Sequence, residues 1–104
     1  MFLTVLQIEN CQNAESLIAE LQVLIRDRSD VTLNSIVIHS EEEGRRLGFH
    51  GSPTILIDGK DPFPAPEIPV GLSCRRYPGG RDDPETVRGF PSELQLRQVL
   101  TGDN

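Results

Sequence analysis

Long hydrophobic runs and an excess of basic residues are both missing from this sequence. No apolar run approaches the roughly 20 residues that a membrane-spanning helix needs. The first nine residues are apolar-rich but carry no basic segment, and no small-residue cleavage site follows, so a signal peptide is not expected. Ten Lys and Arg face sixteen Asp and Glu, and the formal net charge is −6. This balance disfavours nucleic acid and membrane partners. We therefore expect a cytoplasmic protein.

Cysteine is also scarce, because Cys11 and Cys74 are the only two in 104 residues. In a reducing compartment such residues are expected to be catalytic, redox-active or inert rather than joined as a structural disulfide. The spacing of Cys and His matches no zinc signature, so we predict neither a metal nor a cofactor. The chain has no internal repeat and no long linker, which predicts a single domain over residues 1–104.

Strand-like and helical segments alternate along the chain. Apolar, β-branched runs predict strands at Phe2–Ile8, Val31–His39, Pro53–Asp58 and Val70–Tyr77. Apolar residues at helical spacing predict a helix between Asn13 and Ile25.

Two capping boxes predict where the other helices begin. Ser40 precedes Glu43 by three residues and Ser92 precedes Gln95 by three, so each Ser should cap a helix. Gly48 should end the first of these helices. The Pro-rich residues 60–69 and the Gly-rich residues 78–89 are expected to be loops.

The resulting order is βαβαββα, an α/β fold. We expect two right-handed βαβ units followed by an antiparallel hairpin. These make a four-stranded mixed sheet with helices on both faces, in the order of a thioredoxin-like domain.

Four sequence pieces carry a closer resemblance. They are Glu9-Asn10-Cys11-Gln12-Asn13, Gly48–Gly59 with Asp61-Pro62-Phe63, Gly71-Leu72-Ser73-Cys74-Arg75, and Gly89-Phe90-Pro91-Ser92. In these pieces, which span nearly the whole chain, the sequence resembles a small thioredoxin-like family known as DF-family (seleno)proteins. The resemblance implies a thioredoxin fold and a thiol redox role. Some relatives carry an alkylmercury lyase-like label.

The chain departs from the redox pattern of that family at one position. A dithiol relative has Cys-Pro-x-Cys, whereas this chain has Cys11-Gln12-Asn13-Ala14. Cys11 keeps the nucleophile position at a helix N-terminus, where free N–H groups favour thiolate. Glu9 and Glu15 oppose this effect, and a small inert Cys capping the helix is the alternative.

The turn around Ser52–Pro53 is the predicted substrate surface. A cis Ser52–Pro53 bond is expected in such a tight turn, and it would turn the backbone of Ser52 outward to pair with an extended segment of another molecule. Thr54 and His50 border the same surface, and a solvated loop histidine is the alternative reading of His50. The partner is then a protein or a small-molecule thiol or disulfide, and Cys11 attacks it to form a mixed disulfide.

Cys74 is the one internal candidate for resolving that mixed disulfide. An antiparallel hairpin would bring Cys74 toward the Ser52–Pro53 end of the sheet, but a bridge needs Cα atoms closer than about 7 Å. A packed or half-exposed strand Cys is the alternative reading of Cys74, and glutathione or another protein is the alternative resolver.

Two other functions remain open: a non-catalytic binding module on the same surface, and a thiol protein for a soft metal or an organomercurial. The second would use Cys11, Cys74 and His50. Arg75-Arg76 is interpreted as an exposed charge pair on an edge strand, with an anion site as the alternative. Asp61-Pro62-Phe63 is either a lid or partner surface, or a loop pinned to the core by Phe63.

Overall fold

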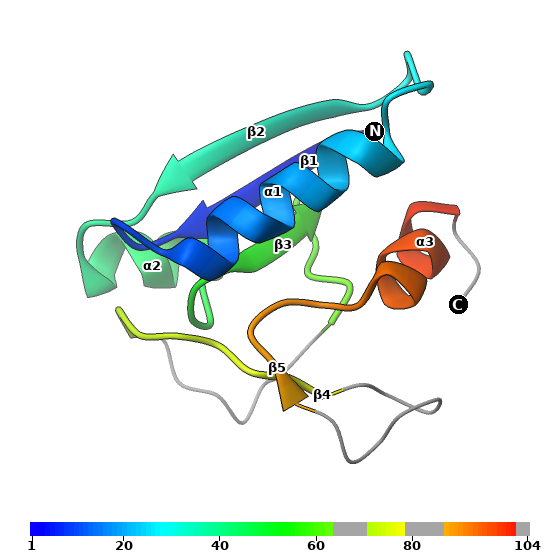
Figure 1. The fold of residues 1–104 in the computed structure, drawn as a ribbon. Coiled ribbons are helices and arrows are strands. Elements are labelled where there is room, and N and C mark those ends of the chain that lie inside the picture. Colours follow the sequence, from blue (N-terminus) through cyan, green and yellow to red (C-terminus); the bar gives the residue numbers. More distant parts are fainter. Residues whose placement is uncertain (64–70, 79–86, 102–104) are drawn as a thin grey trace.

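The computed structural model describes residues 1–63, 71–78 and 87–101 (Figure 1). In chain order the elements are β1 (Phe2–Gln7), α1 (Gln12–Leu24), β2 (Thr32–Val37), α2 (Glu41–Leu47), β3 (Thr54–Ile57), β4 (Tyr77–Pro78), β5 (Val87–Arg88) and α3 (Glu93–Thr101). The mixed α/β class is confirmed: within these residues three helices accompany a three-stranded mixed sheet.

The main sheet has the strand order β2-β1-β3. β1 runs parallel to β2, with Val5 opposite Ser35, and antiparallel to β3, with Val5 opposite Ile55. The first βαβ unit is therefore present, but the expected second one is wrong.

The length of α2 explains the reversed direction of β3. Seven helical residues advance about 10 Å, whereas the six residues of β2 extend about 20 Å. The helix thus cannot carry the chain back along the sheet. β3 starts at the end where β2 stops, and it runs in the opposite direction.

The expected fourth strand, Val70–Tyr77, is not part of this sheet. Val70 and most of the Pro-rich loop lie outside the described residues, and residues 71–76 form no strand. Tyr77, the last residue of that expected strand, and Pro78 form β4, which pairs with β5 in a separate two-stranded sheet; Pro78 and β5 fall in the expected loop 78–89.

The predicted helix caps are confirmed. Ser40 Oγ accepts a hydrogen bond from Glu43 N at 3.1 Å, and Gly48 ends α2 in the left-handed region at φ 79°. At α3 the capping box is reciprocal: Gln95 N donates to Ser92 Oγ at 3.2 Å, and Ser92 N donates to Gln95 Oε1 at 2.9 Å.

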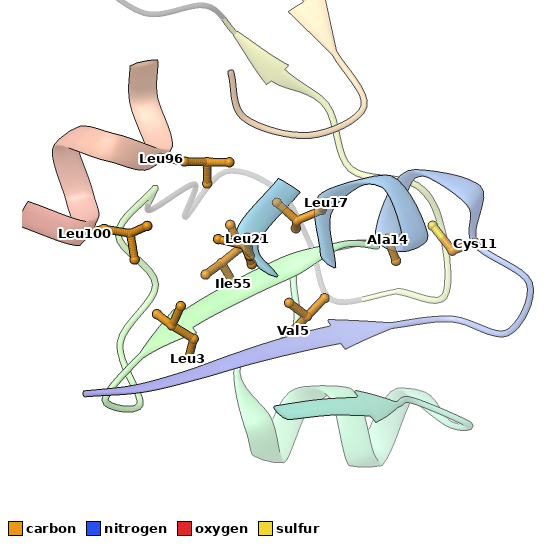
Figure 2. Packing of buried hydrophobic residues seen from close by; sticks show 9 residues of the cluster. All are labelled: Leu3, Val5, Cys11, Ala14, Leu17, Leu21, Ile55, Leu96 and Leu100. Atoms are coloured by element: carbon orange, nitrogen blue, oxygen red, sulfur yellow. The ribbon is translucent and has the colours of Figure 1, made fainter. Parts of the chain in front are cut away.

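The sheet separates two apolar clusters because successive side chains of a strand point to opposite faces. The larger cluster lies under α1 and α3, as Figure 2 shows: Leu3, Val5, Cys11, Ala14, Leu17, Leu21, Ile55, Leu96 and Leu100. The smaller cluster is formed by Leu6, Ile38 and Phe49, with Leu47 of α2 and Leu56 packed against it. Helices thus pack against both faces of the sheet.

Candidate functional site

Cys11 is the N-cap residue of α1. Its backbone is extended (φ −86°, ψ 106°), its carbonyl accepts Glu15 N at 3.2 Å, and its side chain makes no capping hydrogen bond. The residue is 8% exposed and belongs to the larger apolar cluster, at the end farthest along α1 from Leu21 (Figure 2). Cys11 therefore combines the helix N-terminus with near-complete burial.

The Ser52–Pro53 turn lies against the connection that leads to Cys11. Ser52 Oγ accepts a hydrogen bond from Ile8 N at 3.1 Å, and Ile8 follows directly after β1. The Ser52–Pro53 peptide bond is cis, which confirms the expectation for this turn. The two halves of the predicted site are thus held together by a bond between their loops.

The backbone of Ser52 is paired within the chain instead of facing outward. Ser52 N donates to Ser73 O at 2.7 Å, and Arg75 N donates to Ser52 O at 2.9 Å. These two bonds make an isolated parallel bridge between Ser52 and Cys74. Residues 73–77 cross the turn as an extended segment that we call the strap.

Because the strap covers the turn, the predicted substrate surface is buried. Ser52 and Thr54 are 0% exposed, and Pro53 is fully buried with them. Gly51 permits the close approach: its φ is +101°, and a Cβ there would lie 2.8 Å from Arg75 Cβ. A side chain at position 51 and the observed strap are therefore incompatible without a shift.

Thr54 and His50 are engaged inside the same turn. Thr54 Oγ1 donates to Gly51 O at 2.6 Å and accepts a hydrogen bond from His50 N at 3.3 Å. His50 is half-buried. In this conformation both residues shape the turn under the strap.

Arg75 is a structural anchor that the sequence did not indicate. Its side chain is 2% exposed and pairs with Asp61 Oδ2 at 2.7 Å, and it also donates to the carbonyl of Phe63. The guanidinium lies 4.5 Å from the centroid of the Tyr77 ring. The prediction of an exposed Arg75-Arg76 pair is thus wrong for Arg75, because this ion pair compensates its burial, whereas Arg76 is exposed.

Tyr77 and Phe63 complete this anchor. The Tyr77 hydroxyl donates to the carbonyl of Pro53. The rings of Tyr77 and Phe63 are arranged edge to face, with their centroids 5.7 Å apart. Burial raises the pKa of Tyr77, and the nearby Arg75 charge opposes part of that rise. Phe63 also packs against the larger apolar cluster. The reading of Asp61-Pro62-Phe63 as a loop pinned by Phe63 is confirmed.

The two cysteines differ in their surroundings. Both are free thiols; Cys11 is buried and Cys74 is exposed on the strap. Among residues 1–63, 71–78 and 87–101, no group of three or more Cys, His, Asp or Glu side chains is arranged to hold a metal ion. Within these residues, Cys11, Cys74 and His50 are therefore not arranged as a three-ligand metal site.

A second segment covers the first turn of α1. Gly89, which follows β5, lies so close to Asn13 that a Cβ on Gly89 would fall 2.3 Å from Asn13 Nδ2. Since β5 pairs with β4, and β4 begins at Tyr77, this cover is continuous with the strap through backbone pairing. The strap and the neighbourhood of Cys11 are thus structurally linked.

In the part of the chain that the structure describes, no helix is both long enough and apolar enough to cross a membrane. Comparison with models of known protein families, with curated proteins and with solved structures finds no match to this chain.

Proposed function

We propose that the protein is a thioredoxin-like thiol–disulfide oxidoreductase of the monothiol type, with Cys11 as its nucleophile. The observation that carries this proposal is the hydrogen bond from Ile8 N to Ser52 Oγ. It joins the Ser52–Pro53 turn to the loop that ends in Cys11, so a disulfide presented at the turn would lie near the helix N-terminus.

The arrangement of the sheet supports the same proposal. β1 is central, parallel to β2 and antiparallel to β3, and Cys11 begins the helix that follows β1.

The chemistry needs no metal or cofactor. The Cys11 thiolate attacks one sulfur of a disulfide, a bond forms between Cys11 Sγ and that sulfur, and the other sulfur leaves as a thiolate that takes up a proton. Ala14 stands where a dithiol relative has its resolving cysteine. A second thiol, either Cys74 or a small thiol such as glutathione, then attacks the mixed disulfide and releases Cys11 in its reduced form.

The proposal is tested with Cys11→Ser and Cys74→Ser variants incubated with glutathione disulfide. We expect the Cys74→Ser protein to form a mixed disulfide and to return to the free thiol when reduced glutathione is added. The Cys11→Ser protein should react only slowly through Cys74. Equal, slow reaction of the two variants would contradict the proposal.

Burial favours one alternative, a non-catalytic binding module. Cys11 is part of the apolar cluster, and Ser52 has both backbone groups paired within the chain. In that case wild-type protein should co-purify with a stable partner, while a resolving-deficient Cys74→Ser bait should trap no disulfide-linked protein.

A further inference from the structure

The strap makes on Ser52 the two backbone bonds that an incoming extended peptide would make. Ser52 offers one N–H and one carbonyl, and both are used by the strap, through Ser73 O and Arg75 N. We propose that the strap occupies the peptide position at Ser52 and is displaced when an extended, cysteine-containing peptide binds. This inference rests on the proposed function, whose substrate class it names.

Little backbone pairing would be lost in such an exchange. The Ser52–Cys74 bridge is isolated, so it is not part of a continuous ladder. Leu72, Ser73 and Cys74 are exposed. A peptide that replaces the strap restores the same two hydrogen bonds. The net change then depends on the side-chain anchors and on the β4–β5 pairing that moves with the strap.

The anchors are strong but incomplete. Arg75 pairs with Asp61, and Tyr77 donates to Pro53 O, which hold the strap down. However, Arg75 Nε is buried and has no hydrogen-bond partner among the described residues. An unpaired buried donor destabilises the closed arrangement relative to one in which that donor reaches water.

The anchors also indicate which peptide would compete. When Arg75 leaves, the Asp61 carboxylate and the Phe63 carbonyl lose their cationic donor. A peptide with an arginine directly after its cysteine replaces that donor, whereas a peptide without one leaves a partly buried carboxylate uncompensated. The favoured ligand is therefore an extended peptide with a disulfide-bonded Cys followed by Arg, the sequence that Cys74-Arg75 itself presents.

Displacement of the strap would also uncover Cys11. The strap ends in β4, β4 pairs with β5, and Gly89 after β5 rests on Asn13 in the first turn of α1. Movement of the strap either breaks the β4–β5 pairing or moves β5 along with β4. In both cases Gly89 moves away from Asn13, and the cover beside Cys11 is removed. Peptide binding and thiol exposure are then coupled in one movement.

The test loosens the strap without touching Cys11 or Ser52. Asp61→Asn keeps an acceptor for Phe63 N, which bonds Asp61 Oδ1 at 2.8 Å, but removes the charge that pairs with Arg75. Asp30→Asn is the matched control, because it removes an Arg–Asp pair of similar length, 2.8 Å, between half-buried Arg28 and exposed Asp30. The readouts are amide hydrogen exchange at Ser52 and Arg75 and the rate of Cys11 alkylation by N-ethylmaleimide.

We expect Asp61→Asn to raise both rates at least tenfold, as the loss of a hydrogen bond to a charged group implies. The β1 amides, which report global unfolding, should exchange more slowly than those of Ser52 and Arg75 in both proteins, because the strap opens locally, and Asp30→Asn should change none of these rates. A synthetic Leu-Ser-Cys-Arg peptide, oxidised to its glutathione mixed disulfide, should bind wild-type protein more tightly than its Arg→Ala version does. In Asp61→Asn protein this difference in affinity between the two peptides should be smaller.

Some results would overturn the inference. One is exchange at Ser52 and Arg75 that rises no more than in Asp30→Asn. Another is peptide binding that leaves the Arg75 amide protected; Ser52 N does not discriminate here, because the bound peptide itself accepts its hydrogen bond. Failure of the proposed function gives a different pattern: the strap opens and the peptide binds, but Cys11 forms no mixed disulfide in either protein.

Discussion

Replacing Arg75 by Met tests how the strap is held, because the change removes a charge that is 2% exposed while keeping most of the side-chain volume. The charge-assisted bond to Asp61 contributes about 2 kcal/mol and the bond to the Phe63 carbonyl about 1 kcal/mol. The contact with the Tyr77 ring adds about 1 kcal/mol. We expect the free energy of unfolding of Arg75→Met to fall by about 4 kcal/mol.

The partner substitution Asp61→Asn should lower the free energy of unfolding by less than Arg75→Met does. Breaking a fully buried pair costs about 3–5 kcal/mol, but the Asp61 side chain is 14% exposed, so water compensates part of the loss. We expect about 2–3 kcal/mol for this variant. Since both single changes remove the same ion pair, the double variant should lose about 2 kcal/mol less than the two single losses combined.

The free energy of unfolding of the wild type, the two single variants and the double variant is measured by urea unfolding, monitored by far-UV circular dichroism. Tyr77 is the only tyrosine and the chain has no tryptophan, so tyrosine fluorescence gives a second probe that is local to the strap. Additive losses, within about 0.5 kcal/mol, would refute the argument that Arg75 and Asp61 act as a coupled anchor.

Three further predictions concern the strap and α3. Burial raises the pKa of Tyr77 in the folded protein, so the unfolded chain loses this proton first as the pH rises. The free energy of unfolding, measured by urea, should therefore fall above about pH 10, and Tyr77→Phe should remove this pH dependence. Alkaline tyrosinate absorbance of the wild type reports the ionisation itself. Gly51→Ala should lower the free energy of unfolding by about 2 kcal/mol more than Gly59→Ala, because both glycines have positive φ but only a Cβ at position 51 meets Arg75. Gly51→Ala should also speed alkylation of the buried cysteine. Equal losses of stability in the two variants would contradict the close approach. Ser92→Ala should cost about 1 kcal/mol by removing the N-cap of α3, measured by urea unfolding, and an unchanged midpoint would show that the cap contributes nothing.

Local signals in the sequence were reliable guides to local structure. Ser40 and Ser92 act as helix caps because a capping box is satisfied by residues three positions apart, and Gly48 ends α2 because only a residue that tolerates positive φ fits there. The central apolar strand Phe2–Ile8 and the helix after Cys11 were predicted for the same reason: their periodicity is visible in a short window.

Long-range arrangements were predicted less well. The direction of β3 depends on how far α2 can carry the chain. The predicted ends at Ser40 and Gly48 already implied a short helix, but the expectation of a second βαβ unit followed from the order of the elements and not from this length. The strap depends on Arg75 reaching Asp61, fourteen positions earlier, and two adjacent arginines give no local sign that one is buried. The covered state of Ser52 therefore could not be predicted from the turn itself.

The central claim is that Cys11, although buried, is the thiol that reacts with disulfides. The most direct measurement adds less than one equivalent of glutathione disulfide to the reduced wild-type protein and locates the first mixed disulfide by peptide mass spectrometry. Exposure alone would place it on Cys74, which is solvent-accessible, whereas Cys11 is 8% exposed. The account predicts that the modification appears first on Cys11; modification that appears first and only on Cys74 would contradict it.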